Sequence, residues 1–413
     1  MKMLESGLFA TYGLELEYML VHAETLEVMA IADEVLRHDC GAYCNSVEKN
    51  GMAWSNELAL HVIEIKNDRP VAALGELLAP MERQVVDIRK IAAALNATLL
   101  PTAMHPWMDP HTETKLWPHG NKQIYNTYNR IFDCRGHGWS NVQSTHLNLG
   151  FAGDEQFGRL HAAIRLLLPI LPALAASSPI ADGKFTGLAD TRLDYYRANQ
   201  RRVPILTGKV IPEQVFTESD YQQQIFARID AAIAPFDPEQ ILEPIWLNSR
   251  GAIARFDRGA IEIRVLDIQE CPLADIAIAL LISEVLRMLV DERWLAFDRQ
   301  QGLAVAPLAE IFGATVADGR EAVIADQAYL QALGMPETRA TAQEIWLHLA
   351  AGCEKALNGY EPRLKAAIND LLRHGNLAQR IVRAVGGDPD RGKLREVYGQ
   401  LAACLAEGRL FLP

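Results

Sequence analysis

Positive charge is in short supply in this sequence. Lysine and arginine together number 40 against 52 aspartates and glutamates, which gives a formal net charge of −12, and no tract is rich in lysine or arginine. Nucleic acids and anionic membranes attract proteins through basic surfaces, so this balance argues against either as the main partner. Any phosphate that the protein binds must therefore be held by a local cluster of side chains or by metal ions.

Cysteine is also scarce. The chain has 6 cysteines in 413 residues, which does not amount to a disulfide framework in a chain of this length. Cys40 and Cys44 lie close together, but no second pair at similar spacing completes a zinc site. We therefore expect reduced thiols.

Long hydrophobic runs are missing as well. The longest weakly charged stretch, residues 166–181, is interrupted by prolines and is too short to span a bilayer comfortably. No apolar segment of the signal-peptide type precedes Gly13. Because the composition, with 49% hydrophobic and 22% charged residues, is ordinary for a globular protein, we expect a soluble cytoplasmic protein with no membrane partner.

What the sequence does contain begins with the segment Gly13-Leu-Glu15-Leu-Glu17-Tyr18. As a β-strand, it places its apolar side chains on one face and Glu15 and Glu17 on the other. Two ionised carboxylates roughly 6–7 Å apart on one strand face repel each other unless cations lie between them. Taken alone, an exposed strand face on which acids alternate is the simpler explanation.

Three later segments share this pattern of one apolar face and one face that carries ionisable or hydrogen-bonding side chains. They are residues 62–66, 144–151 and 260–267. Antiparallel pairing of the four strands can converge their polar faces into a basin of five carboxylates and one imidazole. Such a basin is unstable unless cations fill it, and two or three divalent ions would stabilise it and hold a nucleotide's phosphates. The polar residues that the three segments contribute are Glu64 with Glu57 just upstream, His146 with Asn148, and Glu262 with Arg264.

Arginines supply the complementary charge. Arg250, Arg255 and Arg264 can contact phosphoryl oxygens or stabilise charge that develops during phosphoryl transfer. Each element also has an ordinary explanation, because a lone histidine such as His146 more often belongs to a core or loop. The arginines at 250–258 can likewise form a solvated turn. Only the joint occurrence of these residues favours a functional site.

The remainder of the pattern is mainly helical. Apolar residues recur at helical spacing in several stretches, and we expect an α+β catalytic region over residues 1–300 followed by a mainly helical region over residues 301–413. The expected helices cover residues 71–96, 154–177, 221–234 and 273–294, and a C-terminal bundle begins near residue 338.

The polar segment 105–140 stands apart from this regularity. It is rich in histidine, asparagine, glycine and aromatic residues, and it has no clear period over much of its length. A connection this long is usually functional or mobile in a compact domain. A loop that covers the substrate and an ordered surface excursion explain it equally well.

Taken together, these residues resemble the glutamate–cysteine ligase superfamily, in particular its bacterial carboxylate–amine ligases, which share the catalytic fold of glutamine synthetase. The resemblance implies a curved antiparallel sheet, flanked by helices, that cradles ATP and two or three Mg²⁺ or Mn²⁺ ions. It spans roughly residues 10–290 and is carried, in order, by Gly13-Leu-Glu15-Leu-Glu17-Tyr18, Glu57 and Glu64, Thr145-His146-Leu-Asn148-Leu-Gly150, Ala175-Ala-Ser-Ser-Pro179, Thr186-Gly187, Arg192, and Ile261-Glu262-Ile-Arg264-Val-Leu-Asp267.

The resemblance also implies roles for individual residues. Two sets of residues resemble the ligands of two metal ions. Three further sets resemble the family's catalytic, nucleotide-binding and substrate-binding residues. The first ion is assigned Glu17, Glu57 and Glu64, and the second Glu15, His146 and Glu262. We assign catalysis to Arg264, Arg250 and Glu262, nucleotide binding to Asn148, Arg255 and Arg264, and substrate binding to Arg192, Arg197 and Thr145.

Two departures from the family pattern bear on these assignments. Many ligases of this group have a second histidine where this chain has Asn148, which puts the role of that histidine in question here. The bulky aromatic residue that usually follows Ser-Ser-Pro is replaced by Ile180. Acceptor specificity is expected to lie in the segment 105–140, which matches the family poorly.

The expected function is ATP-dependent amide formation between small molecules through an acyl phosphate. Glutamate as the carboxylate donor and cysteine or a related amine as the acceptor are the favoured substrates. A guanidino kinase and a catalytically silent nucleotide-binding member of the family are the alternatives. The sequence leaves open the identity of both substrates and whether the chain forms a homo-oligomer.

Overall fold

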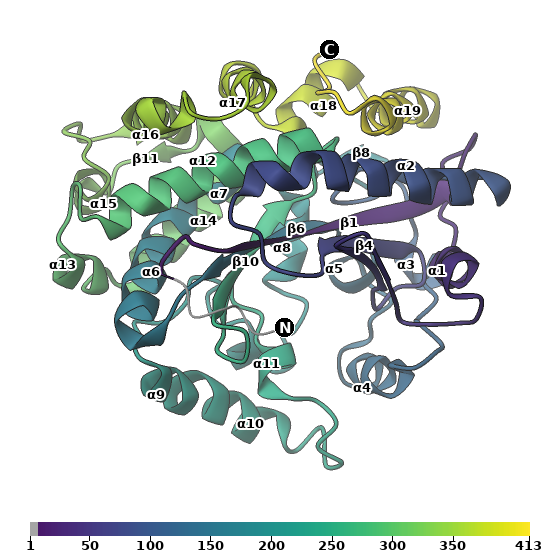
Figure 1. The fold of residues 1–413 in the computed structure, drawn as a ribbon, viewed down its shortest axis with the longest axis horizontal. Coiled ribbons are helices and arrows are strands. Elements are labelled where there is room, and N and C mark those ends of the chain that lie inside the picture. Colours follow the sequence, from purple (N-terminus) through teal and green to yellow (C-terminus); the bar gives the residue numbers. More distant parts are fainter. Residues whose placement is uncertain (1–6) are drawn as a thin grey trace.

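A computed structural model describes residues 7–413 and has an eight-stranded sheet at its centre (Figure 1). The strand order is β2-β3-β4-β1-β6-β10-β9, β5 pairs with the far end of β1, and every pairing is antiparallel. The α+β fold class expected from the sequence is confirmed. The strands are β1 (Tyr12–His22), β2 (Ser46–Lys49), β3 (Met52–Asn56), β4 (Val62–Asn67), β5 (Ala97–Leu100), β6 (Ser144–Gly150), β9 (Ala252–Arg255) and β10 (Ala260–Asp267).

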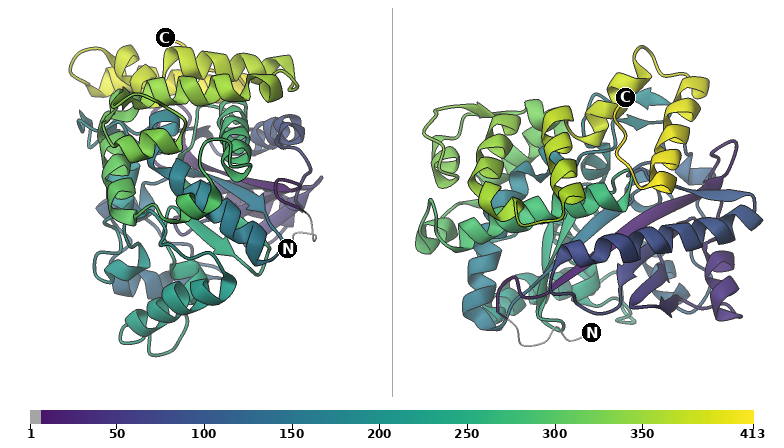
Figure 2. Two further views of the ribbon diagram at one scale, coloured as in Figure 1. Left: turned by 90° about the vertical axis from the view of Figure 1, so that its left-hand side faces the viewer. Right: turned by 45° about the horizontal axis from the view of Figure 1, so that its top comes forward.

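Helices cover the two faces of this sheet unequally. On one side lie the long helices α2 (Leu78–Ala94) and α12 (Pro272–Val290), with the C-terminal helices beyond them (Figures 1 and 2). On the other side lie short helices and loops, among them α4 (Lys122–Phe132), α10 (Ala227–Ile233) and α11 (Pro244–Leu247). The first side therefore holds the core, and the second is left partly open.

The remaining elements connect these layers. Two small hairpins, β7–β8 (Ile180–Ala181, Lys184–Phe185) and β11–β12 (Val323–Ile324, Ala340–Thr341), lie apart from the main sheet. The other α-helices are α1 (Ala32–Cys40), α3 (Pro110–Glu113), α5 (His137–Ser140), α6 (Gly153–Leu167), α7 (Leu171–Ala175), α8 (Thr191–Tyr196), α9 (Glu218–Tyr221), α13 (Phe297–Gln301), α14 (Val305–Asp318), α15 (Gln327–Ala332), α16 (Ala342–Leu357), α17 (Pro362–His374), α18 (Leu377–Val385) and α19 (Arg391–Glu407).

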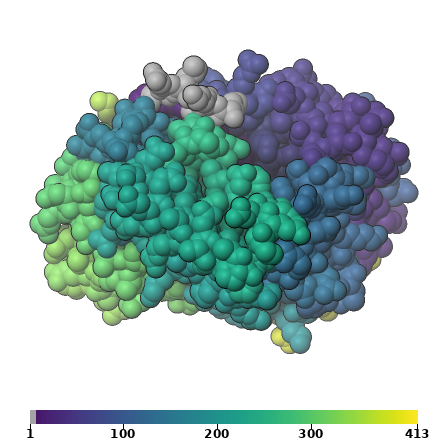
Figure 3. Space-filling view, turned by 90° about the horizontal axis from the view of Figure 1, so that it is seen from below, coloured from purple at the N-terminus to yellow at the C-terminus, as the bar shows by residue number. Residues whose placement is uncertain are grey.

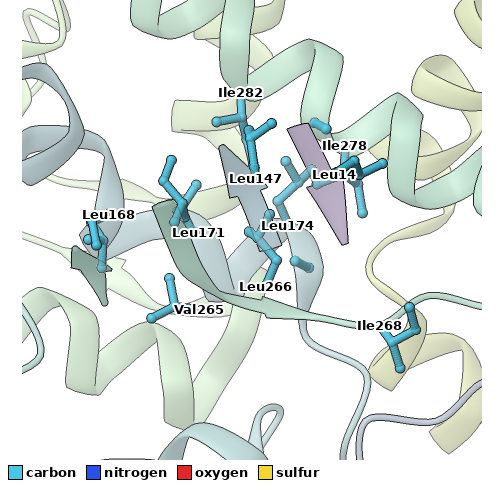
Figure 4. Close-up of a cluster of buried hydrophobic side chains, with 14 of the residues drawn as sticks. Leu14, Leu147, Leu168, Leu171, Leu174, Val265, Leu266, Ile268, Ile278 and Ile282 are labelled. Carbon is cyan, nitrogen blue, oxygen red and sulfur yellow. The ribbon is translucent and has the colours of Figure 1, made fainter. Parts of the chain in front are cut away.

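The main core forms where the apolar faces of the strands meet α12 and α7. Leu14 of β1 and Leu147 of β6 lie below Ile278 and Ile282 of α12 (Figure 4). All four side chains are at most 2% exposed, and each contributes about 1.5–3 kcal/mol by leaving water. The two-residue period read from the sequence therefore does set which side chains enter the core.

One helical stretch, Gly153–Ala175, is long and apolar enough to cross a membrane by length and hydropathy. However, 94% of its best window is buried inside the protein. It consists of α6 and α7 joined by a short 3₁₀ turn at Leu168–Ile170, which contains Pro169. Its apolar composition is accounted for by packing in the core of this fold.

The 105–140 segment is more ordered than its sequence pattern suggests. It contains the short helices α3 and α5 and the 11-residue helix α4. The sequence expectation did not include α4, although Ile124, Tyr128 and Ile131 recur at helical spacing and pack in or against the core. The helix packs beside the open face of the sheet and supplies side chains to the cavity described below.

The C-terminal helices extend the same body. Residues of α16 and α17, such as Trp346 and Leu371, join the core cluster of the sheet, so the division at residue 300 remains a prediction. A second cluster forms where α18 and α19 cover Met19 and Val21, at the far end of β1. These two side chains share a strand face with Glu15 and Glu17, so this face is apolar where helices cover it and acidic where they do not.

A buried ion pair ties this C-terminal region to the segment that precedes α12. Arg380 of α18 pairs with Glu270, and both side chains are completely buried. The Arg380 Nη1 also donates to the Phe411 carbonyl at 2.8 Å, and Glu270 accepts from the Phe411 N–H at 3.1 Å. The pair therefore holds three distant parts of the chain together.

We predict that Arg380→Met lowers the free energy of unfolding by about 3–5 kcal/mol, because it leaves the Glu270 carboxylate buried without a partner. Urea denaturation measures the change. Adding Glu270→Gln to this variant should recover part of the loss, and Arg373→Met, at an exposed position of α17, should have little effect. A wild-type-like denaturation midpoint for Arg380→Met would contradict this role.

Candidate active site

The open face of the sheet carries the polar residues in neighbouring strands. Glu15 lies between Lys66 of β4 and His146 of β6 in the strand register, and Glu17 lies beside Glu64. Glu262 of β10 pairs with Asn148 of β6. The basin expected from the sequence is therefore present. It forms because four strands with the same alternation lie next to one another.

The tightest group in this basin is formed by Glu15, His146 and Glu262. Their candidate ligand atoms all lie within 4.8 Å of one another. His146 Nδ1 is 3.2 Å from Glu15 Oε2 and 3.7 Å from Glu262 Oε1. Two carboxylates and one imidazole suit a divalent cation such as Mg²⁺ or Mn²⁺, so the donor set fits the metal that the sequence predicts here.

The second expected group, Glu17, Glu57 and Glu64, is more dispersed. Glu17 Oε2 accepts hydrogen bonds from the backbone N–H of Ser144 at 2.7 Å and from its hydroxyl at 3.0 Å. Glu64 Oε2 accepts from the Ser55 hydroxyl and pairs with Lys66. These carboxylates share the cavity, but protein donors already engage one oxygen each of Glu17 and Glu64.

The pKa values of the acids diverge within this small volume. Burial opposes ionisation of Glu15, but the hydrogen bond and charge of His146, together with Lys66, outweigh it and hold the pKa of Glu15 well below its usual range. Burial, with the charges of Glu17 and Glu64, raises the pKa of Glu57 well above it. Burial also raises the pKa of Glu64 to about 7, although Lys66 opposes the shift. Without cations, the basin thus favours partial protonation.

Two of the arginines that line the basin contact Glu262. Arg255 of β9 lies 3.4 Å from Glu262 Oε2, and Arg264 Nε lies 3.2 Å from Glu262 Oε1. The register of β10 against β6 shifts between Ile263 and Leu266, and such an irregularity can redirect a side chain. The Nε of Arg264 is buried and ion-paired with Glu262, although it makes no hydrogen bond of good geometry among the described residues.

Two further sequence-predicted residues lie at the edges of the basin. Asn148 Nδ2 donates to Glu15 Oε1 at 3.2 Å, and Gly13 lies opposite Asn148 so closely that a Cβ there would come within 3.2 Å of the Asn148 Cβ. Arg192 of α8 pairs with Asp267 at the end of β10, where both side chains are buried. This pairing anchors Arg192 beside the cavity that contains Glu17 and Arg264.

The Arg192–Asp267 pair also explains two of the segments quoted from the sequence. Asp267 Oδ2 accepts from the backbone N–H of Ser177 at 2.7 Å and from the hydroxyl of Ser178 at 2.9 Å. The Ser-Ser-Pro segment, Arg192 and the end of β10 therefore meet at one buried, hydrogen-bonded centre. Its role is to position Arg192 and the start of α8.

Three predicted site residues do not reach the basin. Arg250 is buried but pairs with Glu213, and its Nη1 donates to Asn248 at 3.0 Å. Arg197 is exposed and pairs with Asp194 one turn earlier. Thr145 points to the opposite face of β6, where its hydroxyl donates to Asp275 Oδ1 at 2.6 Å. The geometry gives these three no contact with a ligand in the basin.

The basin continues into a groove with three adjoining parts. A central cavity of about 370 Å³ contains the five carboxylates, His146 and the cationic side chains, and cavities of about 220 and 280 Å³ adjoin it. Seen from the open side, the N-terminal third of the chain and its teal middle part meet along a furrow (Figure 3). The groove can therefore hold an elongated ligand.

Sequence reasoning missed several residues that line this groove. Lys66 and Ser144 could have been found, because each shares a strand face with an assigned acid or histidine. Four aromatic residues, from α4, α5, α8 and α11, had no such signal, because short helices and loops bring them together. They line the cavity of about 220 Å³ and are Tyr128, Trp139, Tyr196 and Trp246.

The expectation of reduced thiols is wrong for one pair. Cys40, the last residue of α1, forms a disulfide with Cys44, and the next residues, Asn45 and Ser46, line the central cavity. The spacing of the pair does not complete a zinc site, but it lets the chain fold back across four residues and join the two thiols. The other four cysteines are free and buried.

The contact between Thr145 and Asp275 leads to a prediction about pH. Burial raises the pKa of Asp275 to about 8, although hydrogen bonds from Thr145 and the Gln269 N–H oppose the shift. The folded protein therefore holds a proton that the unfolded chain releases near pH 4, and the free energy of unfolding should fall as pH rises from about 4 to about 8. Asp275→Asn should flatten this dependence in urea titrations at several pH values. A variant that keeps the wild-type slope would contradict the assignment.

Several known proteins are similar to this chain in sequence. A protein of Archaeoglobus fulgidus without an assigned function is 35% identical over 275 residues, 66% of this chain and 73% of the relative. A protein of Nocardia farcinica provisionally named glutamate–cysteine ligase 2-1 is 24% identical over 408 residues, 96% of this chain and 94% of the relative. A protein of Ruegeria pomeroyi provisionally named glutamate–cysteine ligase 2 is 25% identical over 298 residues, 70% of this chain and 69% of the relative.

Solved structures share the fold. A bifunctional glutathione synthetase from Pasteurella multocida superposes with a TM-score of 0.62 at 15% identity; the match covers 96% of this chain and 53% of that one, so this chain corresponds to about half of its length. A glutamate–cysteine ligase from Francisella tularensis, in complex with AMP, gives a TM-score of 0.60 at 11% identity over 96% of this chain and 89% of that one. These likenesses support the fold alone.

The family is established by a match that covers nearly the whole chain. The model of glutamate–cysteine ligase family 2 matches residues 11–400, which include all the strands of the central sheet and every assigned site residue. The resemblance stated from the sequence is thereby confirmed. This chain belongs to glutamate–cysteine ligase family 2.

Proposed function

We propose that this protein is an ATP-dependent carboxylate–amine ligase of the glutamate–cysteine ligase type. The observation that carries the proposal is the basin in which Glu15, His146 and Glu262 converge within 4.8 Å, beside three further acids and three arginines. The acids suit divalent cations, and the arginines suit phosphoryl oxygens. The proposal places the protein in the cytoplasm, where ATP and free amino acids are available.

The proposed reaction has two steps. In the first, a carboxylate oxygen of the donor attacks the γ-phosphorus of ATP, the bond to ADP breaks and an acyl phosphate forms. In the second, an amine attacks the acyl carbon, phosphate leaves and an amide forms, while the amine proton passes to phosphate or to an acidic side chain. Bound divalent ions would neutralise phosphate charge during this sequence.

Arg264 is the residue best placed to act on the transferred group. Its side chain lines both the acidic central cavity and the aromatic-walled cavity, the adjoining one of about 220 Å³ that contains Tyr128, Trp139, Tyr196 and Trp246. A guanidinium at this junction can stabilise negative charge that develops on the transferring phosphoryl oxygens. Glu262, 3.2 Å away, orients it.

The aromatic-walled cavity is proposed to hold the amino-acid substrates. It joins the central cavity at Glu17, Glu57, His146 and Arg264, so a carboxylate placed there can face the γ-phosphate. Arg192 and Asn199 line it, and the Asn199 Oδ1 has no donor among the described residues. An arginine and an unpaired amide oxygen suit the carboxylate and the ammonium group of an amino acid.

The test is ADP release with Mg-ATP across a panel of amino acids and amines, with mass spectrometry of the product. Glutamate and cysteine together are expected to give an amide and stoichiometric phosphate. Absence of turnover with glutamate would refute glutamate as the donor. Phosphorylation of a guanidino substrate without amide formation would favour a kinase. Thermal stabilisation by nucleotide without turnover on the whole panel would favour the silent family member.

We predict that Glu15→Gln and Glu262→Gln each reduce ADP release by at least about 100-fold, because each removes a charged oxygen ligand from the tightest group in the basin. Rates at saturating Mg-ATP measure the effect. Glu24→Gln, at an exposed turn, is the matched control and should retain full activity. Full ADP release by both basin variants would disprove the metal assignment.

A further inference from the structure

Lys66 is a cation inside the acidic basin that the family assignment does not explain. It shares a face of β4 with Glu64 and lies directly across from Glu15 in the strand register. His146 lies across from Glu15 on the other side. Glu15 is therefore placed between an ammonium group and the imidazole of the candidate metal group.

The contacts of Lys66 limit what Glu64 can bind. The Lys66 ammonium pairs with Glu64 Oε2, the same oxygen that accepts from the Ser55 hydroxyl. An oxygen that receives two protein donors has little remaining capacity for a metal ion. Only Oε1 of Glu64 then remains for a metal ion, so Lys66 removes one oxygen from the expected ligand set of Glu17, Glu57 and Glu64.

The charges that line the central cavity also reduce the number of metal ions that the basin requires. Four cationic side chains, Lys66, Arg255, Arg258 and Arg264, line it together with the five carboxylates. The protein itself therefore offsets much of the repulsion that was expected to require as many as three divalent ions. Lys66 and Arg258 also line the adjoining cavity of about 280 Å³. They therefore lie at the junction of the two cavities, where an elongated ligand would extend from one into the other.

We propose that the ammonium group of Lys66 takes the place of a third divalent cation, so that the basin binds two metal ions together with ATP. In this position Lys66 neutralises Glu64 and contacts the ATP phosphates from the β4 side, while the metal ions lie toward Glu15, His146 and Glu262. The inference rests on the proposed binding of ATP and divalent ions. It concerns the number of ions and the role of Lys66, which the family assignment leaves undetermined.

The test counts the metal ions directly. Mn²⁺ is titrated into the protein with the non-hydrolysable analogue AMP-PNP, free Mn²⁺ is followed by electron paramagnetic resonance, and bound Mn²⁺ is checked after equilibrium dialysis. The wild-type protein is expected to bind two ions. Lys66→Gln should bind three, because it frees Glu64, and its affinity for AMP-PNP at limiting Mn²⁺ should fall about tenfold through the loss of one charge-assisted contact.

Matched variants separate this role from a general loss of structure. Lys66→Arg keeps the charge and should bind two ions, and Lys66→Gln/Glu64→Gln should lose the third ion again. Lys49→Gln removes a lysine of β2 that pairs with Asp39 and does not line the basin cavities, so it should behave as wild type. Circular dichroism and thermal unfolding establish that each variant is folded.

Each outcome bears on the proposal. Three ions in the wild-type protein, or two ions in both wild type and Lys66→Gln, would overturn the role of Lys66 and leave the ligase proposal intact. Two ions with AMP-PNP but no turnover on any substrate would refute the ligase and leave the role of Lys66 standing. Absence of Mn²⁺-dependent AMP-PNP binding would refute both.

Discussion

Repulsion among carboxylates on one sheet face is the constraint on which the site depends. Glu15, Glu17, Glu64 and Glu262 come from three strands, and Glu57 joins them from the loop after β3. In the protein alone, burial together with this repulsion raises the pKa values of Glu57 and Glu64, whereas His146 and Lys66 hold the pKa of Glu15 well below its usual range. The basin is therefore prepared for cations, and its chemistry depends on how many of these the protein supplies itself.

The surrounding structure leaves the basin uncovered and fixes the positions of the arginines at its wall. α12 and α7 fill the opposite face of the sheet with apolar side chains (Figure 4), and α18 and α19 cover only the far end of β1. The register shift in β10 and the buried pair of Arg192 with Asp267 place two guanidinium groups at the cavity wall. Burying such pairs costs desolvation energy, which is offset here by the hydrogen bonds from Ser177 and Ser178.

Part of this arrangement could be predicted from alternation. The two-residue period predicted the polar faces of the four strands and the possibility of a shared basin. The grouping of Glu15, His146 and Glu262 at one ion came from the resemblance to the family, and the structure brings these three residues together. The role of Arg250 could not be judged, because its partner Glu213 is distant in the sequence. Arg197 differs, because its partner Asp194 lies only one helical turn earlier. The helix α4 and the Cys40–Cys44 disulfide are also local features, and the sequence contains the helical spacing and the close cysteine pair that indicate them.

The sequence by itself determined which side chains share a strand face, because the direction of a side chain in a strand depends only on its neighbours along the chain. It thereby placed Lys66 with Glu64 and His146 with Asn148. Tertiary structure alone decided which strands lie side by side, which arginines remain free for a ligand and which aromatic residues wall the adjoining cavity. These outcomes depend on contacts between residues far apart in the chain, where packing and charge pairing select one arrangement among many.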